Sequence, residues 1–206
     1  ENPKQQDRSE KDLRRVGAIP NDRILDKLGW KDKVRAIIIS HAHLDHLGGI
    51  PYIAYRYPEA EIIGTPFTIS VLKSILRDDK LQIKNKIRIV NTNSTNIIKG
   101  KSGSYKLDFI HITHSTLQCS FPALHTKKGI FFYGLDLKFD NYPTLGNPPN
   151  YKKMRELGRE GVKVLIIDGL YSRTEKKPGG EMVAKHLLEE AFSKARNKNS
   201  ALFITT

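Results

Sequence analysis

Four side chains of the kinds that bind metal ions occur within six residues of this sequence, in His41-Ala42-His43-Leu44-Asp45-His46. They follow an apolar run, residues 34–40, that has the composition of a buried strand. A loop at the end of such a strand can hold reactive groups firmly while leaving them open to a substrate. Imidazole and carboxylate ligands suit zinc, manganese or iron. We therefore predict a metal site here; the alternative is a polar, hydrogen-bonded entrance to a helix.

The composition limits the other kinds of site that the chain can carry. The 206 residues include a single cysteine, Cys119, so neither an internal disulfide nor a thiolate zinc site is expected. The formal net charge of +13 favours a polyanionic partner, although lysine-rich solvated faces that keep a protein soluble are the plainer explanation. No stretch is apolar enough for a membrane span or a signal peptide, which predicts a cytoplasmic protein without a membrane contact.

The hydrophobic pattern predicts the elements that position this loop. Strands are expected where apolar residues alternate or form short runs, and helices where they recur every three or four residues. The predicted strands cover residues 34–40, 61–64, 86–90, 96–99, 105–112, part of 120–125, 129–133 and 162–168, the last of them buried. The predicted helices begin at Asn21 or Asp22, near Leu47, at Thr65 as N-cap, at Tyr151 and at Gly179. Early alternation of strand and helix indicates an α/β layered fold.

Both ends of the chain differ from this regular middle. Residues 1–15 are polar and charged, and we interpret residues 1–20 as a linker or a disordered end. The sequence does not begin with methionine, so we expect it to start inside a longer protein. Residues 201–206 have the pattern of a strand that has just begun.

The histidine loop resembles the His-x-His-x-Asp-His motif of the metallo-β-lactamase superfamily and matches it at every defined position. The superfamily's later ligands are a histidine and an aspartate at two strand ends, and His114 and Asp136 are the residues that match. The resemblance implies an αββα sandwich with two metal ions at one edge. His41, His43 and His114 would hold one ion, Asp45 and His46 the other, and Asp136 would bridge them.

Further motifs narrow the resemblance to the β-CASP nucleases, and within them to the archaeal ribonuclease J family. These motifs are residues 44–51, Thr65-Pro66-Phe67-Thr68, Thr113-His114-Ser115 and residues 136–140. Asp168 matches the acid that opens the β-CASP region and orients a catalytic histidine in that family. We therefore divide the chain into a metallo-β-lactamase core without its first strands, residues 21–170, and the beginning of a β-CASP domain, residues 171–206.

The resemblance also implies a function. It predicts a zinc-dependent ribonuclease, with manganese as the alternative metal, that hydrolyses single-stranded RNA from the 5′ end. Additional endonuclease activity and a homodimer are also compatible with the resemblance. Asp45, Asp136 and Asp168 are the expected catalytic residues, and Asp45 would also accept a proton from the nucleophile. The family's last histidines would lie beyond residue 206, so we expect one metal ligand to be missing. The alternatives are a hydrolase of a small thioester or lactone, and an inactive RNA-binding subunit.

Several other residues have competing interpretations. His111 is a spare candidate for the role of His114, whereas His125 and His186 are expected to be ordinary strand and helix residues. Cys119 is expected to be a small interior or loop residue. Lys138 would contact a phosphate or would simply be solvated. The aromatic side chains that could stack on bases are expected to pack in the core instead; they are Trp30, Tyr52, Tyr55 and Tyr57.

Overall fold

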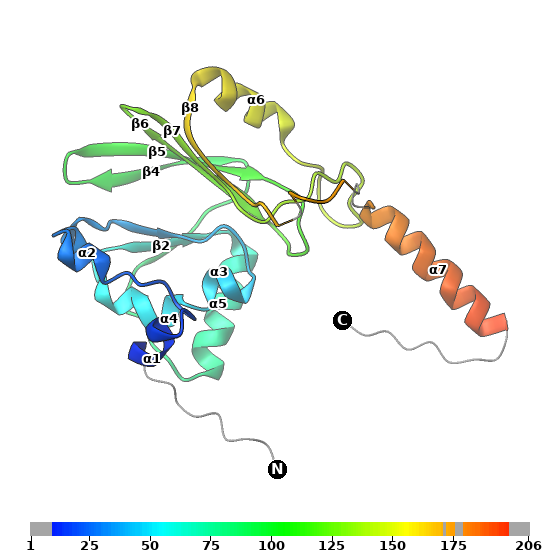
Figure 1. Cartoon of the computed structure of the whole chain (residues 1–206), viewed down its shortest axis with the longest axis horizontal. Helices are drawn as coiled ribbons and strands as arrows, with labels where there is room; N and C mark the ends of the chain where they lie inside the picture. Colours follow the sequence, from blue (N-terminus) through cyan, green and yellow to red (C-terminus); the bar gives the residue numbers. More distant parts are fainter. Residues whose placement is uncertain (1–9, 171, 176–178, 198–206) are drawn as a thin grey trace, which may run out of the picture.

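The protein folds into two β-sheets that face each other, with helices on their outer sides (Figure 1). The computed structural model describes residues 10–170, 172–175 and 179–197. One sheet has three parallel strands in the order β1 (Ala36–Ile38), β2 (Glu61–Gly64), β3 (Ile87–Ile89). The other has five strands in sequence order, β4 (Ser94–Gly100), β5 (Gly103–His111), β6 (Ser120–Thr126), β7 (Gly129–Gly134) and β8 (Val162–Ile167), all antiparallel except that β8 runs parallel to β7.

Apart from α1, the helices occur among the strands in the order that the sequence pattern predicts. They are α1 (Glu10–Arg15), α2 (Ile24–Lys27), α3 (Leu44–Leu47), α4 (Ile50–Ile53), α5 (Pro66–Asp78), α6 (Tyr151–Glu160) and α7 (Glu181–Asn197), with 3₁₀ turns at Lys31–Lys33 and Ala54–Arg56. Figure 1 shows α3, α4 and α5 outside the three-stranded sheet, α6 outside the five-stranded sheet, and α7 pointing away from both. No helix in the described part of the chain is long and apolar enough to cross a membrane.

Three apolar clusters hold these layers together. Successive residues of a strand point to opposite faces, so one strand can serve two clusters. In β2, Ile62 packs towards α5 while Ile63 packs between the sheets, and in β5 Phe109 and Ile110 divide in the same way. The clusters therefore form one layer between the sheets and one on the outer side of each. This is the predicted αββα sandwich.

Residues 10–20 differ from the expected linker, whereas residues 1–9 lie outside the described residues. Residues 10–15 form α1, and Asp22 ties this helix to the body of the protein. The Asp22 carboxylate accepts hydrogen bonds from Arg14 Nε at 2.8 Å, Arg56 Nε at 2.7 Å and the Tyr57 hydroxyl at 2.6 Å. Asp22 consequently does not cap α2, whose N-cap is Arg23. The charged residues of α1 were predicted to be solvated because Arg56 and Tyr57, which also bind Asp22, lie far away in the sequence.

One further local prediction was confirmed in position and another was wrong. Thr65 is the N-cap residue of α5, as predicted, and Pro66 begins the helix; the Thr65 side chain makes no cap hydrogen bond, and Gln118 Oε1 instead accepts a hydrogen bond of 2.8 Å from the Phe67 backbone N–H. Strand β8 was expected to be buried, yet Leu165 and Ile167 are 56% and 54% exposed. It is the edge strand, paired only with β7 among the described strands, and these side chains are left largely open to solvent. Residues 201–206 lie outside the described residues, and the start of a β-CASP domain stays a prediction.

Candidate metal centre

The histidine loop begins where β1 ends. Ile39 and Ser40 are buried, and His41 is completely buried at the carboxyl end of the parallel sheet. The chain then turns into α3, with His43 at the N-cap position in an extended conformation. Asp45 and His46 therefore fall in the first turn of that helix, facing the same region as His41 and His43. Leu47, which has no exposed surface, fixes the helix to the core.

The other half of the centre comes from two strand ends of the five-stranded sheet. His114 follows β5 and Asp136 follows β7. The backbone N–H of Lys138 donates to Thr113 O at 2.9 Å, and the Thr113 hydroxyl donates to Lys138 O, so the two segments are joined directly beside the candidate ligands. Ser120 N donates to Ser40 O at 3.0 Å and links this sheet to the histidine loop.

Four imidazoles converge on the Asp136 carboxylate. Asp136 Oδ2 lies 3.5 Å from His41 Nε2, 3.9 Å from His43 Nδ1, 3.4 Å from His46 Nε2 and 3.5 Å from His114 Nε2. His43 Nδ1 is also 3.1 Å from His41 Nε2 and 2.9 Å from His114 Nε2. These contacts gather ring nitrogens and a carboxylate, which are typical ligands of a divalent metal ion, in one small volume. A bound cation would satisfy such a donor set.

The cluster divides into two groups that share Asp136. One group is His41, His43, His114 and Asp136, and the other is Asp45, His46 and Asp136; within each, the ligand atoms lie within 4.8 Å of one another. Asp45 Oδ2 is 3.5 Å from His46 Nε2, and the Asp45 side chain is 76% exposed. Asp136 has a φ of 54°, in the left-handed region that aspartate adopts more readily than most residues other than glycine.

The electrostatics keep the buried imidazoles neutral. Burial, followed by the nearby rings of His46, His114 and His43, lowers the pKa of His41 to about 3. Burial likewise lowers the pKa of His114. A neutral imidazole offers the lone pair that a metal ion needs, so both residues are available as ligands near neutral pH. No lysine or arginine forms an ion pair with the carboxylates of this cluster within the described residues.

Two serine hydroxyls contact the far nitrogens of the histidines, and sequence reasoning missed both. Ser40 Oγ is 2.9 Å from His41 Nδ1, and Ser115 Oγ is 3.1 Å from His43 Nε2. If each ring donates its N–H to the hydroxyl, its other nitrogen is left as a lone-pair donor facing the cluster. The sequence could have pointed to both hydroxyls, because each serine is adjacent to a predicted ligand, in Ser40-His41 and His114-Ser115.

The remaining candidates lie elsewhere. Asp168 follows β8 and accepts a hydrogen bond from Leu170 N at 2.8 Å, with no described contact to the cluster, so its role stays a prediction. His111 Nε2 is 2.8 Å from Asn147 O, and His125 pairs with Asp108, which leaves neither in the cluster. Cys119 is fully buried, and burial raises the pKa of its thiol to about 12, as expected for an interior residue.

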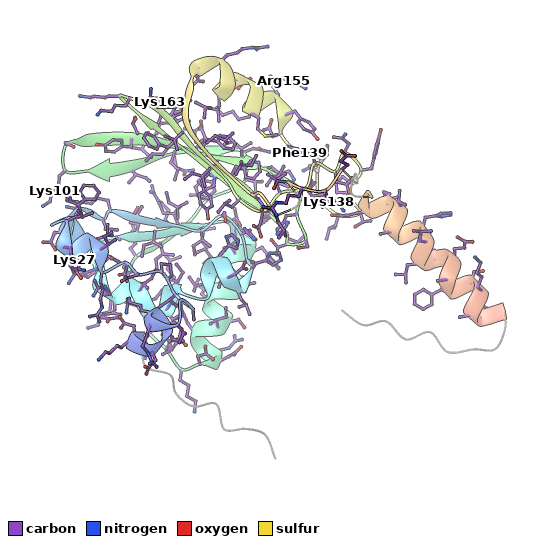
Figure 2. All side chains as sticks on the ribbon, in the orientation of Figure 1. Lys27, Lys101, Lys138, Phe139, Arg155 and Lys163 are labelled. Carbon is purple, nitrogen blue, oxygen red and sulfur yellow. The ribbon has the colours of Figure 1, made fainter. Side chains whose placement is uncertain are left out.

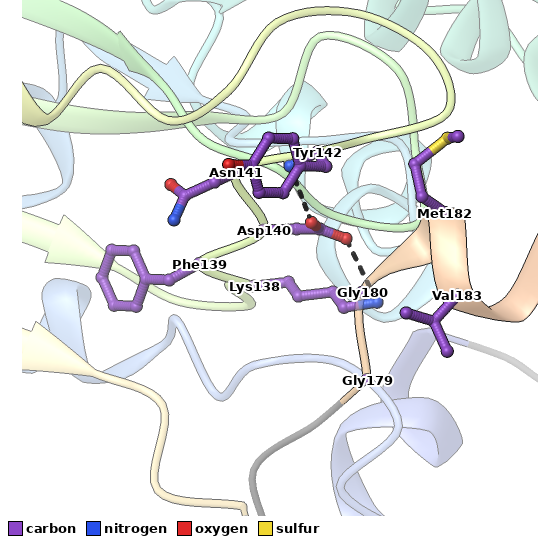
Figure 3. Close-up of a pocket in the computed structure, with 9 residues that line it drawn as sticks. All are labelled: Lys138, Phe139, Asp140, Asn141, Tyr142, Gly179, Gly180, Met182 and Val183. Atoms are coloured by element: carbon purple, nitrogen blue, oxygen red, sulfur yellow. Dashed lines mark hydrogen bonds and ion pairs between the residues drawn. The ribbon is translucent and has the colours of Figure 1, made fainter.

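One cavity borders the centre and a second shares Lys138 with it. The first, of about 480 Å³, is lined by residues that include His114, Ser115 and Thr144. The second, of about 570 Å³, lies between residues 138–142 and the start of α7 and is lined by no candidate ligand (Figure 3). Asp140 lines the second cavity and accepts backbone hydrogen bonds from Tyr142 at 3.0 Å and Glu181 at 2.6 Å. These volumes are in the range of small-molecule and cofactor sites.

Comparison with known proteins agrees with this arrangement. A sequence profile for the β-lactamase superfamily domain matches residues 21–196. The chain belongs to the β-lactamase superfamily. Membership confirms the fold class expected from the histidine motif, an incomplete sandwich of the metallo-β-lactamase type.

Within the superfamily, the chain is similar to two archaeal proteins named Ribonuclease J. It is 41% identical to that of Pyrococcus abyssi and 37% identical to that of Methanocaldococcus jannaschii, over 96% and 92% of this chain. The chain spans 43% and 41% of the length of these relatives. Among solved structures, a metallo-β-lactamase of Cronobacter sakazakii is 16% identical, with a TM-score of 0.48 over 91% of this chain and 83% of that one.

Proposed function

We propose that this chain carries the metal centre of a ribonuclease that hydrolyses phosphodiester bonds of RNA. The observation that carries the proposal is the pair of ligand groups joined at Asp136, in a chain 41% identical to a protein named Ribonuclease J. Two divalent ions, zinc first and manganese as the alternative, are proposed as the cofactors. When bound, they would supply an activated water and positive charge at the attacked phosphate.

The residues of the chain have distinct proposed tasks. His41, His43 and His114 would hold one ion, Asp45 and His46 would hold the other, and Asp136 would belong to both ligand groups. The Asp45 side chain, which is 76% exposed, would also be the group that accepts a proton from the nucleophile. Asp168 is proposed to orient a histidine outside the cluster. Single-stranded RNA attacked from its 5′ end, a cytoplasmic location and a homodimer belong to the same proposal.

The charge of the chain supports RNA over a small molecule as the substrate. The net charge of +13 favours a polyanion, and Lys138 borders both cavities. A neutral thioester or lactone would gain nothing from this charge. The size of the cavities also suits a small molecule, so the choice of RNA depends on the charge and on the similarity to the Ribonuclease J proteins.

The deciding experiment compares substrates and label positions. The full-length protein, purified with zinc or manganese, is given RNA carrying a 5′-monophosphate and a label at either end, and separately a small thioester. We expect release of short products from the 5′ end and no cleavage by His43→Ala. Turnover of the thioester without RNA cleavage would contradict the proposal, and RNA binding without cleavage would indicate an inactive subunit.

A further inference from the structure

A basic groove lies at the end of the five-stranded sheet that is farthest from the candidate metal centre. The β4–β5 and β6–β7 hairpins turn there, at residues 100–103 and 126–129. Strand β5 runs nine residues from Gly103 to His111, close to the centre, which is a separation of about 27 Å. Figure 2 shows Lys101 and Lys163 at this end of the molecule, well away from Lys138.

The groove has a volume of about 760 Å³, and we call it the hairpin groove. Its lining includes Tyr105, Lys106, His125, Lys127, Lys128 and Phe131, and contains no carboxylate. Lys101 adjoins it in the first turn. Lys163 borders the second turn, because a Cβ built on Gly129 would lie 2.8 Å from Lys163 Cβ.

The lysines of the hairpin groove are available to a ligand. Lys101, Lys127, Lys128 and Lys163 are exposed and form no ion pair with a residue in the described ranges. Lys106 lies 3.8 Å from Asp108. That carboxylate is 1% exposed and is also contacted by other cations, so it does not neutralise the surface.

The turn that carries two of these lysines is internally fixed. Thr126 Oγ1 donates to Gly129 O at 2.8 Å and accepts from Lys128 N at 3.1 Å. Gly129 has a φ of 115°, which favours glycine at this position. The Lys127 and Lys128 charges are therefore presented by an ordered turn, and binding a ligand does not require ordering of its backbone.

A second opposing charge beside Asp108 is Glu160, whose Oε2 is 3.5 Å from His125 Nδ1. Five lysines around one groove outweigh these two carboxylates. A lysine ammonium is a point charge without the forked geometry that reads a particular base or carboxylate, so the chemistry suits a polyanion held through its phosphates. A concave groove accommodates a strand better than a flat bilayer, and the 40% exposed Phe131 offers a ring for stacking.

We propose that the hairpin groove binds a distal segment of the RNA whose scissile phosphate lies at the candidate metal centre. This inference rests on the proposed function. Because the two sites lie about 27 Å apart, a short RNA occupies the metal centre alone, whereas a longer strand reaches both. The groove therefore makes affinity depend on RNA length without changing the cleavage step.

The test compares two triple charge reversals in the full-length protein. The groove variant is Lys101→Glu with Lys127→Glu and Lys128→Glu. The matched control carries Lys73→Glu, Lys80→Glu and Lys84→Glu, three exposed lysines on and after α5 that form no ion pair within the described residues. Circular dichroism checks that both fold. Fluorescence anisotropy then measures binding of RNA of about 5 and about 30 nucleotides across a salt series, and cleavage of both is followed.

We expect the groove variant to bind the long RNA at least about tenfold more weakly than the control, with the salt slope lower by about 2. Binding and cleavage of the short RNA should match the control. If the two variants bind the long RNA equally well and still cleave the short RNA, RNA binding by the hairpin groove is contradicted and the proposed function is not. Absence of all cleavage would overturn the function, while the binding comparison would still test the groove. A groove effect seen with anionic vesicles but not with RNA would also contradict the inference.

Discussion

Two clusters of histidine and carboxylate side chains occupy different parts of this fold, and they have opposite charge balance. In the candidate metal centre, the Asp136 carboxylate faces four imidazoles and forms no ion pair with a lysine or arginine among the described residues. On the outer face of the five-stranded sheet, Asp108 lies 2.8 Å from His125 Nε2 and 3.2 Å from Lys153 Nζ. The Thr95 hydroxyl also donates to it.

The difference separates a site that binds from a network that stabilises. Around Asp108 the protein supplies every positive charge and donor that the carboxylate needs, so no external cation is required. Around Asp136, four imidazoles converge on a carboxylate that no lysine or arginine among the described residues pairs with, so a cation from outside the protein would complete the charge balance. Residue types alone do not distinguish the two clusters. The cations that the protein itself places around each carboxylate do.

The largest expected effect is loss of the metal centre in His43→Ala. His43 Nδ1 lies at the meeting point of the first ligand group, so its removal should lower zinc affinity and RNA cleavage by at least about 1,000-fold. Zinc content after dialysis and initial cleavage rates measure this. The matched control is His125→Ala in the other cluster, which should keep its zinc; loss of zinc from both variants would show that the comparison is wrong.

Next in size is the loss of stability in Asp108→Asn. Asp108 is 1% exposed, and its neutral replacement leaves Lys153 near a buried position without its counter-charge. We expect the free energy of unfolding to fall by about 3 kcal/mol, with zinc binding unchanged. Urea denaturation in a chelator provides the measurement. Asp136→Asn should show the reverse, with zinc lost and unfolding little changed; equal destabilisation by both variants would remove the distinction.

The sequence predicted the parts of the site that depend on adjacent residues. The candidate ligands of the histidine loop lie within six residues, and His114 and Asp136 each follow an apolar strand, so pattern and resemblance were sufficient to select the residues that the structure brings together. The order of strands and helices was predictable for the same reason, because each element carries its own periodicity.

Contacts between distant residues were not predictable. Gln118 caps α5 from 51 residues away, and Asp22 ties α1 to residues 56 and 57. The prediction that β8 is buried was wrong because an apolar strand has the same sequence pattern at the edge of a sheet as at its centre. Only the order of the strands shows that β8 lies at the edge. The pairing of Asp108 with His125 likewise required the register of β5 against β6.

A smaller effect is expected from Ser40→Ala. The Ser40 hydroxyl contacts the ring nitrogen of His41 that faces away from the cluster, so its loss frees the ring to change tautomer and orientation. We expect zinc affinity to fall by about tenfold, and Ser40→Thr to restore it. Competition with a chelating dye measures affinity, and the visible absorption of the cobalt-substituted protein reports ligand geometry. An unchanged cobalt spectrum and affinity in Ser40→Ala would show that the hydroxyl does not position His41.

The smallest effect is a pH dependence confined to the stabilising cluster. Burial by itself raises the pKa of Asp108, but hydrogen bonds from Thr95, His125 and Lys153 outweigh it and hold the pKa below its ordinary value. A carboxyl group with a lowered folded-state pKa stabilises the protein above its unfolded pKa of about 3.9, and this contribution is lost as the pH falls through the folded value. The difference in unfolding free energy between the wild type and Asp108→Asn should therefore be full at about pH 7 and should shrink below about pH 4. Urea denaturation of both proteins at several pH values measures it. A difference that stays constant to about pH 3 would mean that the charge of Asp108 contributes little and that shape alone makes this cluster stable.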